Sequence, residues 1–471
     1  MSYHDRVFWF VFFCLLGILG ASTTSLYDLK SGLFFIFAVS VILLLLFNRK
    51  KIHATLALAL FFGGIYYYIH DARYQKFLTA PLYEEIVFQA QILRIDEKED
   101  YKRLTLDLKS HRGKVIVNVS PYQDARYNQE ITVTGKLEPI TGDAKHYFEK
   151  EGVHAALKNP KNIQTRTTPN GFNFKAALFS FREKIVASVS RVLPSPHSNF
   201  VAGLLIGKSG GFSKSFLEAM QKTGTTHLIA LSGYNITIIA TYIINGAIYF
   251  TKRQNAFYIT LLAITLFVIM TGAEASVTRA AIMGSIVLLA DHSRKMYTPR
   301  NTIALTGLIM ALWNPKILAF DVGFQLSFFA LLGILYLKPA LEKLLALNRE
   351  PSFFDWKENL LTTIAAQIAV LPIILKAFGF VSAISLLTNV LVLTLTPYTM
   401  LIGLLLVILN SISTFGALIF AALVKPLIDY QIWVITFFSN YSFGVTVQTV
   451  PIIALALYYF GLLWFVKKYG T

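Results

Sequence analysis

The chain has 471 residues, of which 55% are hydrophobic and only 15% are charged, and its mean hydropathy is +0.55. Soluble domains carry about a quarter charged residues, so this composition excludes an ordinary soluble protein. The formal net charge of +17 does not by itself indicate a nucleic-acid partner, because membrane proteins collect Lys and Arg in their cytoplasmic loops. Cys14 is the single cysteine, which excludes an intramolecular disulfide.

The N-terminal region predicts three membrane-spanning helices, at residues 7–25, 32–47 and 52–70. A basic loop, Arg49 to Lys51, separates the second stretch from the third and is therefore expected in the cytoplasm. The N-terminus is then cytoplasmic as well, and the chain emerges on the outer side after His70. We expect a three-helix membrane segment at residues 1–75 followed by an exported region.

The exported region, at residues 82–167, is polar and alternates with period two. From Arg103 to Lys109 every second residue is apolar, which is the pattern of a strand with one buried face. A turn at His111 to Gly113 joins this strand to the next, and the other strand candidates are residues 86–95, 115–119, 131–137 and 154–157. About five short strands in about 80 residues are typical of a small β-barrel of the OB type.

Residues 174–193 predict an amphipathic helix whose polar side carries Arg182, Lys184 and Arg191. The pattern is typical of a helix lying on the outer membrane surface, and equally of a soluble helix packed on the barrel. We assign residues 174–226 to an interfacial segment of amphipathic helices.

The second membrane block, residues 227–471, contains apolar spans separated by basic loops. These loops fall at Lys252–Arg253, Arg294 to Arg300, Lys338 to Lys357 and Lys467–Lys468. Their spacing returns the chain to the cytoplasm each time, so both termini are expected there. The chain is thus predicted to be a polytopic α-helical membrane protein of about ten to twelve transmembrane helices with an extracytoplasmic OB-like barrel. Residues 382–430 are too continuously apolar to divide into helices.

Polar groups at membrane depth are the best pointers to function in such a chain, because each costs energy unless it is paired or hydrated. His227, Ser232, Gly233 and Asn235 form one such cluster at the start of a span. Ser232 and Asn235 share a helix face, and the Ser-Gly pair can break the helix to expose backbone groups to a cavity. The alternative is ordinary hydrogen bonding between helices.

Arg279 lies a few residues inside a span whose outer end is near Glu274. It can reach the surface and pair with Glu274, or it can face a hydrated cavity, as an anionic substrate would require. Asp321, Gln325 and Ser327 place an acid, an amide and a hydroxyl within seven otherwise apolar residues. Asp321 is also a candidate partner for Arg279 across the bundle.

Gln367 and Asn389 stand alone in apolar runs, where packing contacts are commoner than functional sites. Three residues lie between Gly203 and Gly207, whereas a P-loop needs four between its glycines, so no nucleotide site is expected. The nine histidines are dispersed without metal-binding spacing. We expect neither a metal nor another cofactor.

Four of these segments, in chain order, resemble motifs of the ComEC family of DNA-internalisation competence proteins. The sequence from His227 (HLIALSG) is similar to the family's HLLAISG signature, and that from Ala275 (ASVTRAA) to its PSVxRA element. The segment from Asp321 (DVGFQLSF) resembles the DxGFQLSF run, and residues 379–389 resemble the later SPLSLLAN segment. The segment from Tyr127 to Gly135 resembles the end of the family's OB-like domain.

The resemblance implies a channel in the bacterial cytoplasmic membrane that conducts one strand of captured DNA into the cell during natural transformation. Arg279 would counter the passing phosphates, and the other residues of the path would be His227, Ser232, Gly233, Asn235, Asp321, Gln325, Ser327 and Asn389. OB-type barrels bind single strands with a basic groove and aromatic platforms, which makes Tyr122, Arg126 and Tyr127 candidate DNA contacts.

The sequence departs from the family pattern in three places. Asn235 stands where the family usually has His, so a role that needs a protonatable imidazole is in doubt, and Ala275 replaces a Pro. Many members carry a C-terminal metallo-β-lactamase-like domain, which does not follow before Thr471. We therefore expect conduction without nuclease activity, and not an enzyme.

The expected partners are single-stranded DNA, membrane lipid, a separate metallo-β-lactamase-like nuclease, a DNA receptor and a cytoplasmic motor ATPase. The oligomeric state is not indicated. A transporter or flippase for another anionic substrate is the alternative function. An intramembrane enzyme built on Ser232, His227 and Asp321 is less favoured, because spacing alone does not imply the required geometry.

Overall fold

The computed structural model describes most of the chain, namely residues 3–24, 51–74, 78–97, 100–142, 144–157, 160–165, 173–207, 210–229, 231–293, 298–345, 356–441, 444–447 and 450–470. It divides into two compact units. The first comprises Met1–Phe179 and Met296–Asp321, and the second comprises Ser180–Lys295 and Val322–Thr471. The second predicted span, residues 32–47, lies outside the described residues.

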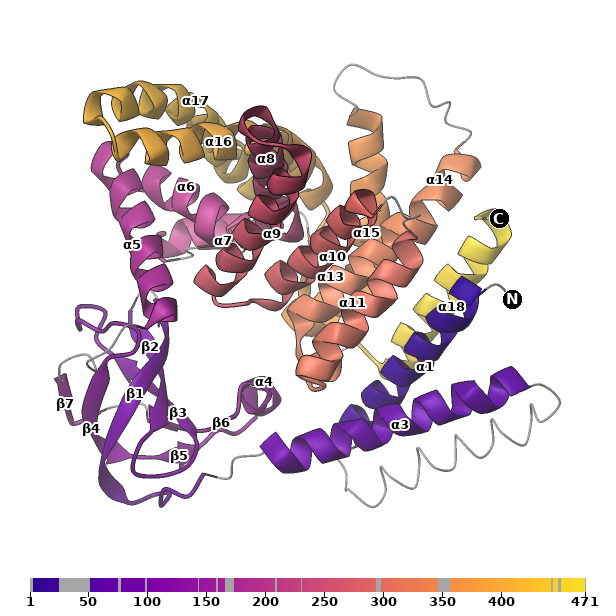
Figure 1. Ribbon diagram of the computed structural model, residues 1–471, viewed down its shortest axis with the longest axis horizontal. Helices are drawn as coiled ribbons and strands as arrows, with labels where there is room; N and C mark the ends of the chain where they lie inside the picture. Colours follow the sequence, from indigo (N-terminus) through magenta and orange to yellow (C-terminus); the bar gives the residue numbers. More distant parts are fainter. Residues whose placement is uncertain are drawn as a thin grey trace. The chain divides into compact units, whose positions relative to one another are not determined.

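The helices of the first unit are α1 (Tyr3–Thr24), α3 (Lys51–Tyr74), α11 (Pro299–Trp313) and the four-residue α12 (Ile317–Phe320). Helices α1 and α3 lie side by side (Figure 1) and meet through glycines. A Cβ on Gly17 would collide with the Leu60 carbonyl, and one on Gly63 would collide with the Cys14 carbonyl. Small residues of this kind let two membrane helices approach closely.

A seven-stranded sheet completes the first unit. Its strands are β1 (Glu85–Glu97), β2 (Lys102–Leu108), β3 (Lys114–Val119), β4 (Glu130–Lys136), β5 (Glu138–Pro139), β6 (Val153–Leu157) and β7 (Asn162–Thr165), with helix α4 (Ala144–Lys150) before β6. The five predicted strands are confirmed as β1, β2, β3, β4 and β6. The short β5, β7 and α4 were not predicted, since strands of two and four residues hardly show alternation and the seven residues of α4 make only about two helical turns.

The sheet order is β5-β6-β3-β2-β1-β4-β7, with β3 and β6 parallel and the other pairs antiparallel. Only Leu137 separates β4 from β5, although the two strands stand near opposite ends of this order. The sheet therefore curls back on itself. Its inner face buries alternate apolar side chains, including Phe88, Ala90 and Ile92 of β1 and Val115 and Val117 of β3. This is the one-faced burial that the period-two alternation predicts.

The second unit is helical. Its helices are α6 (His197–Ile206), α7 (Lys214–Lys222), η1 (Thr226–Leu228), α8 (Gly233–Phe250), α9 (Arg253–Met270), α10 (Ala275–His292), α13 (Val322–Leu332), η2 (Gly333–Leu337), α14 (Lys338–Leu344), α15 (Trp356–Phe378), α16 (Ser385–Asn410), α17 (Thr414–Ser439) and α18 (Ile452–Tyr469). Helix α5 (Phe174–Val192) runs from the first unit into the second, and a two-stranded ribbon pairs β8 (Phe380–Ser382) with β9 (Gly444–Thr446). Helices α16 and α17 form the most extensive helix pair of this unit (Figure 1).

Helix α6 differs from the interfacial segment to which the sequence assigned it. Eight of its ten residues are buried, from Ser198 to Ile206 apart from Asn199, and it packs against α16 and α17. Helix α7 of the same segment does show one apolar face, with Phe216, Ala219 and Met220 buried. The physical reason is composition: α6 is apolar on all sides, and a helix of that kind is buried.

Seven helices of the described residues are long and apolar enough to cross a membrane: Asp5–Thr23, Thr226–Phe250, Arg253–Met270, Val322–Leu344, Leu360–Phe378, Ser385–Asn410 and Thr414–Ser439. The chain is accordingly a polytopic, mostly helical membrane protein. The total of about ten to twelve transmembrane helices and the OB-type barrel stay predictions.

Candidate substrate-path site

The N-terminal ends of α8 and α10 lie together in the second unit. The Ser276 hydroxyl, near the start of α10, donates a hydrogen bond to the Leu231 carbonyl at 2.8 Å, just before α8. Leu231, Ile236 and Val277 bury their side chains against one another beside this bond. Two of the segments that the sequence singled out, 227–233 and 275–281, are thus brought side by side.

Ser232 and Asn235 form a helix cap and an anchor at the start of α8. Ser232 is the N-cap residue, and its hydroxyl accepts from the Asn235 backbone N–H at 3.4 Å and donates to the Asn235 side-chain oxygen at 3.0 Å. The Asn235 amide group, 1% exposed, donates to the Leu204 carbonyl at 3.1 Å, near the end of α6. Asn235 therefore ties α8 to the buried α6. The predicted shared face is present, and both side chains are fully engaged there.

Arg279 lies one turn into α10 and is only 8% exposed. In the part of the chain that the structure describes, no acidic group lies within ion-pair distance of its guanidinium, and Nε has no hydrogen-bond partner. Its nearest polar contact is the Met283 sulfur, 4.0 Å from Nη1. The expected pairing with Glu274 is not among the contacts of Arg279. Its burial is also incompatible with a side chain that reaches out to the surface.

Gly233, the first residue of α8, makes room for this guanidinium. A Cβ at Gly233 would lie 2.7 Å from Arg279 Nη2 and 3.3 Å from the Ala280 Cβ. The charge of Arg279 therefore sits against the N-terminus of α8, where the first backbone N–H groups lack intrahelical acceptors and the helix dipole is positive. Two positive features converge at one place, which is the arrangement that binds an anion.

A second buried polar group, Asn389 on α16, also lacks a partner for its side-chain oxygen. Asn389 is 6% exposed, and its Oδ1 makes no hydrogen bond among the described residues. One turn earlier, Ser385 accepts from the Gln367 amide at 3.2 Å and donates to the Ser382 carbonyl at 2.7 Å. Gln367 thus makes the packing contact that its lone position predicted.

The remaining path candidates of the second unit are less buried. The His227 side chain is exposed, and its Nδ1 lies 3.1 Å from the Gly224 carbonyl oxygen. Gln325 and Ser327 are half-buried on α13, which packs on α15. Thr388 of α16 donates to the Thr223 carbonyl at 2.8 Å and so fixes the chain just before His227.

Asp321 belongs to the first unit and is engaged there. Its carboxylate lies 2.6 Å from the Lys150 ammonium at the end of α4, and both side chains are largely buried. This corrects the expectation that Asp321 answers Arg279. The physical reason is that its partner comes from the β-domain, 171 positions away in the sequence, which no local pattern reveals.

The candidate DNA contacts of the β-domain differ in character. Tyr122 is 94% exposed and free to stack, whereas Arg126 is exposed and lies 3.7 Å from Asp124. The Tyr127 ring packs 4.7 Å from that of Phe179 with Lys175 Nζ 5.2 Å above it, and burial raises the pKa of Tyr127. Tyr127 is thus a packing residue, and Tyr122 is the platform that remains open.

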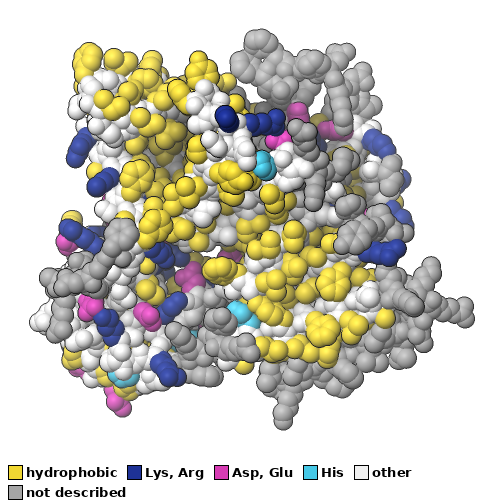
Figure 2. Space-filling model, in the orientation of Figure 1, with side chains coloured by type: hydrophobic (Ala, Val, Ile, Leu, Met, Phe, Trp, Pro, Cys, Tyr) yellow, Lys and Arg dark blue, Asp and Glu magenta, His cyan; other side chains and the backbone are white. Residues whose placement is uncertain are grey.

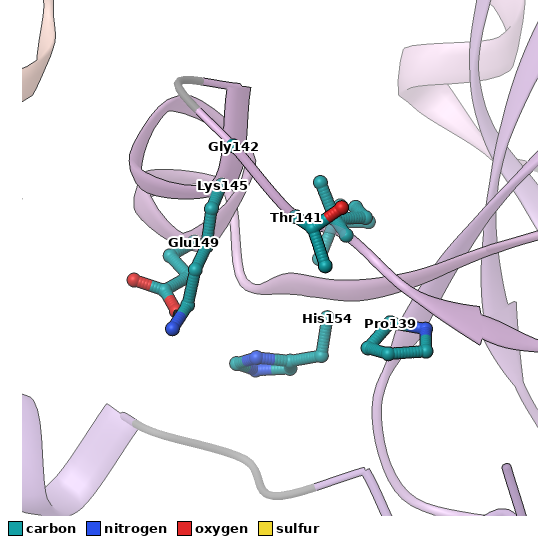
Figure 3. A pocket seen from close by; sticks show the side chains of 8 residues that line it. Pro139, Thr141, Gly142, Lys145, Glu149 and His154 are labelled. Carbon is teal, nitrogen blue, oxygen red and sulfur yellow. Dashed lines mark ion pairs between the residues drawn. The ribbon is translucent and has the colours of Figure 1, made fainter.

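Charged side chains of both signs gather over the β-domain at the lower left of Figure 2, while apolar side chains cover the helices. Several of the cations are neutralised, in the pairs Arg94–Asp96, Lys109–Glu130 and Lys161–Glu85. A cavity of about 330 Å³ lies between β5, β6 and α4, where Thr141, Lys145, Glu149 and His154 line it (Figure 3). Lys145 and Glu149 pair with each other at 3.8 Å, so this cavity offers no spare charge to a phosphate.

Comparison with known proteins places these residues in a family. A model of the competence protein family matches residues 204–469, which is more than half of the chain and includes Asn235, Arg279, Asp321 and Asn389. The chain belongs to the competence protein family. This confirms the resemblance that the ordered motifs indicated.

The chain is also similar to ComE operon protein 3 of Bacillus subtilis (strain 168), with 27% identity over 303 residues. These residues are 61% of this chain and 37% of that protein, so the chain covers well under two thirds of its relative. No solved structure matches the chain significantly. In the described residues, no group of three or more His, Cys, Asp or Glu side chains is placed to hold a metal ion.

Proposed function

We propose that this protein conducts single-stranded DNA across the bacterial cytoplasmic membrane during natural transformation, with Arg279 as a contact for the passing phosphates. Membership of the competence protein family supports the role in DNA uptake. The single observation that carries the site is the guanidinium of Arg279, 8% exposed and without an acidic partner among the described residues, against the N-terminus of α8.

An unpaired charge away from water costs several kcal/mol, so a chain that keeps one there has a use for it. A phosphodiester supplies the missing negative charge and can accept two parallel hydrogen bonds from a guanidinium. Conduction also requires that each phosphate leave again. One cation and one helix terminus suit such transient binding better than a cluster of arginines would.

The topology follows the basic loops. Both termini lie in the cytoplasm, and the N-terminal ends of α8 and α10 open towards the outer side, where the strand would enter. The β-domain is extracytoplasmic and OB-like. The strand pairing supports the OB-like fold. Strand β1 pairs with both β2 and β4, and β3 pairs in parallel with β6. Strand β4 continues into β5, which pairs with β6. Tyr122 offers an exposed ring to a base.

The chain itself cleaves nothing in this proposal. A separate metallo-β-lactamase-like nuclease degrades the other strand, a receptor delivers the DNA and a cytoplasmic motor ATPase supplies the energy. His227, Ser232, Asn235 and Asn389 line or support the path.

Transformation of a deletion strain that carries Arg279→Ala tests the proposal. Loss of one hydrogen bond between charged groups predicts a fall in transformation frequency on the order of 100-fold at unchanged protein level. Arg253→Ala is the matched control, since Arg253 is 77% exposed and paired with Asp291 at 2.8 Å. Wild-type frequency in the Arg279→Ala strain would refute the phosphate contact.

A transporter or flippase for another anionic molecule is the second candidate, because an unpaired buried guanidinium would serve any anion. The deletion strain separates the two functions. Normal transformation in that strain, together with a changed lipid or solute profile, would favour the second candidate.

A further inference from the structure

The connection between α11 and α13, residues 314–321, carries a largely buried ion pair at each end. It contains the four-residue helix α12, with Lys316 directly before the helix and Asp321 directly after it. We call these residues the docking segment. The side chains of Lys316 and Asp321 each form an ion pair with a residue elsewhere in the first unit.

Lys316 pairs with α3. Its ammonium lies 2.7 Å from the Asp71 carboxylate, and the two side chains are 12% and 20% exposed. A second contact lies a few residues earlier in the chain on both sides, where the Tyr66 hydroxyl of α3 donates to the Leu312 carbonyl of α11. Asp71 stands near the end of α3, the helix that leads into the β-domain.

Asp321 pairs with the β-domain. The Lys150 ammonium lies 2.6 Å from its carboxylate, and the side chains are 8% and 13% exposed. The Asn314 amide donates to the Lys150 carbonyl at 3.0 Å, and the Tyr147 ring lies 4.4 Å from the Lys150 ammonium. Burial, followed by the charge of Glu151, raises the pKa of Tyr147 to about 12, so its hydroxyl stays neutral in this contact.

The signs of the four charges define one register. The docking segment presents a cation at one end and an anion at the other, while α3 offers an anion and α4 a cation. Docking in the reverse direction would bring Lys316 to Lys150 and Asp321 to Asp71, and like charges away from water repel strongly. The arrangement therefore selects a single position for the β-domain against α11 and α12.

We propose that residues 314–321 are the site at which the β-domain is fastened to the helices of the first unit, with Lys150 and Asp321 as positioning residues. Asp321, the first residue of the DVGFQLSF motif, then acts in docking and does not line the substrate path. This inference goes beyond the proposed function and does not depend on it.

Thermal melting of the purified full-length protein in detergent tests the docking pair through a double-mutant cycle. Lys150→Met and Asp321→Asn each keep the shape of the side chain and leave the other charge buried, so each should lower the melting temperature by about 5 °C or more. The double variant should lose clearly less than the sum of the two shifts. Additive shifts in melting temperature would overturn the proposal. It would also be overturned if Asp321→Asn reduced DNA uptake while the melting temperature stayed unchanged.

Lys161 and Glu85 provide the matched control, since their pair has the same type of contact at 2.8 Å but is 70% and 50% exposed. Lys161→Met and Glu85→Gln should each shift melting by about 2 °C or less, and additively. A coupling there as large as at the buried pair would also contradict the proposal, because burial would then not be what matters.

If the single variants do not accumulate in the membrane, variants with reversed charges test the proposal through the amount of protein. Lys150→Asp and Asp321→Lys should each lower the amount of full-length protein, and the two together should restore at least half of the wild-type amount. A double reversal no more abundant than the single ones would overturn the proposal in that case. Transformation by the Arg279 variants is a separate readout, so failure here leaves the proposed function standing.

Discussion

Arg279 is a buried cation and Lys150 a largely buried one, and they differ in what surrounds them. Lys150 has a carboxylate at 2.6 Å and an aromatic ring beside it, whereas no acidic group among the described residues pairs with Arg279. Burying a charge is costly in either case, so we assign the pair at Lys150 to docking of the β-domain and propose that the guanidinium of Arg279 meets the phosphates of a passing strand.

The largest effect should come from giving Arg279 a permanent partner. Met283 lies one turn further along α10 with its sulfur 4.0 Å from Arg279 Nη1, so Met283→Glu would place a carboxylate there. We expect transformation to fall on the order of 100-fold, because the neutralised guanidinium no longer attracts a phosphate, while the protein becomes no less stable.

Met283→Gln is the matched control for this substitution, since it has the same shape without the charge. It should transform within about threefold of wild type. Equal defects in the two variants would show that packing around residue 283, and not the charge, is what transport needs.

A smaller effect is expected from narrowing the approach to Arg279. Gly233→Ala places a methyl group 2.7 Å from Nη2, and the flexible end of the arginine must shift to accept it. Displacement of the guanidinium from the N-terminus of α8 should lower transformation about tenfold. Gly246→Ala on the same helix is the control, since a Cβ there meets nothing within 4 Å, and an equal loss in both variants would contradict the role of Gly233.

The smallest effect is expected from restoring the residue that the family usually carries at Asn235. An imidazole N–H in Asn235→His can still donate to the Leu204 carbonyl, so transformation should stay within about threefold of wild type. Asn235→Ala removes that donor and should cost about 1–3 kcal/mol of stability, measured by melting of the purified protein. A gain or loss of tenfold or more in Asn235→His would show that residue 235 meets the substrate.

Five strands and the helices α1, α3 and α5 could be predicted because their alternation, apolar length or amphipathic pattern is local. Arg103 to Lys109 alternates strictly and forms β2, and the apolar stretch at 52–70 lies within α3. Helix α6 was assigned to the membrane surface because it is short and sits between two polar, amphipathic helices. Its composition, which is apolar on all sides, was the available sign of burial, and its packing against α16 and α17 shows that it is buried.

The site residues remain predictions. Arg279, Ser232 and Asn235 were found because polar groups in apolar runs are visible in a sequence, but whether each has a partner depends on tertiary packing. Lys150 was missed altogether, since a lysine at the end of a short polar helix gives no signal. One sequence feature could have drawn attention to Lys316. The predicted topology places it on the outer side of the membrane, where a lysine in a short loop is uncommon.

Binding of a single-stranded oligonucleotide to the full-length protein in nanodiscs, measured over a range of salt concentrations, tests the central claim most directly. If Arg279 contacts a phosphate, Arg279→Ala should weaken binding and reduce the slope of log affinity against log salt by about 0.7, the value for one phosphate of a single strand. Arg253→Ala should leave the slope unchanged. An unaltered slope in Arg279→Ala would contradict the account.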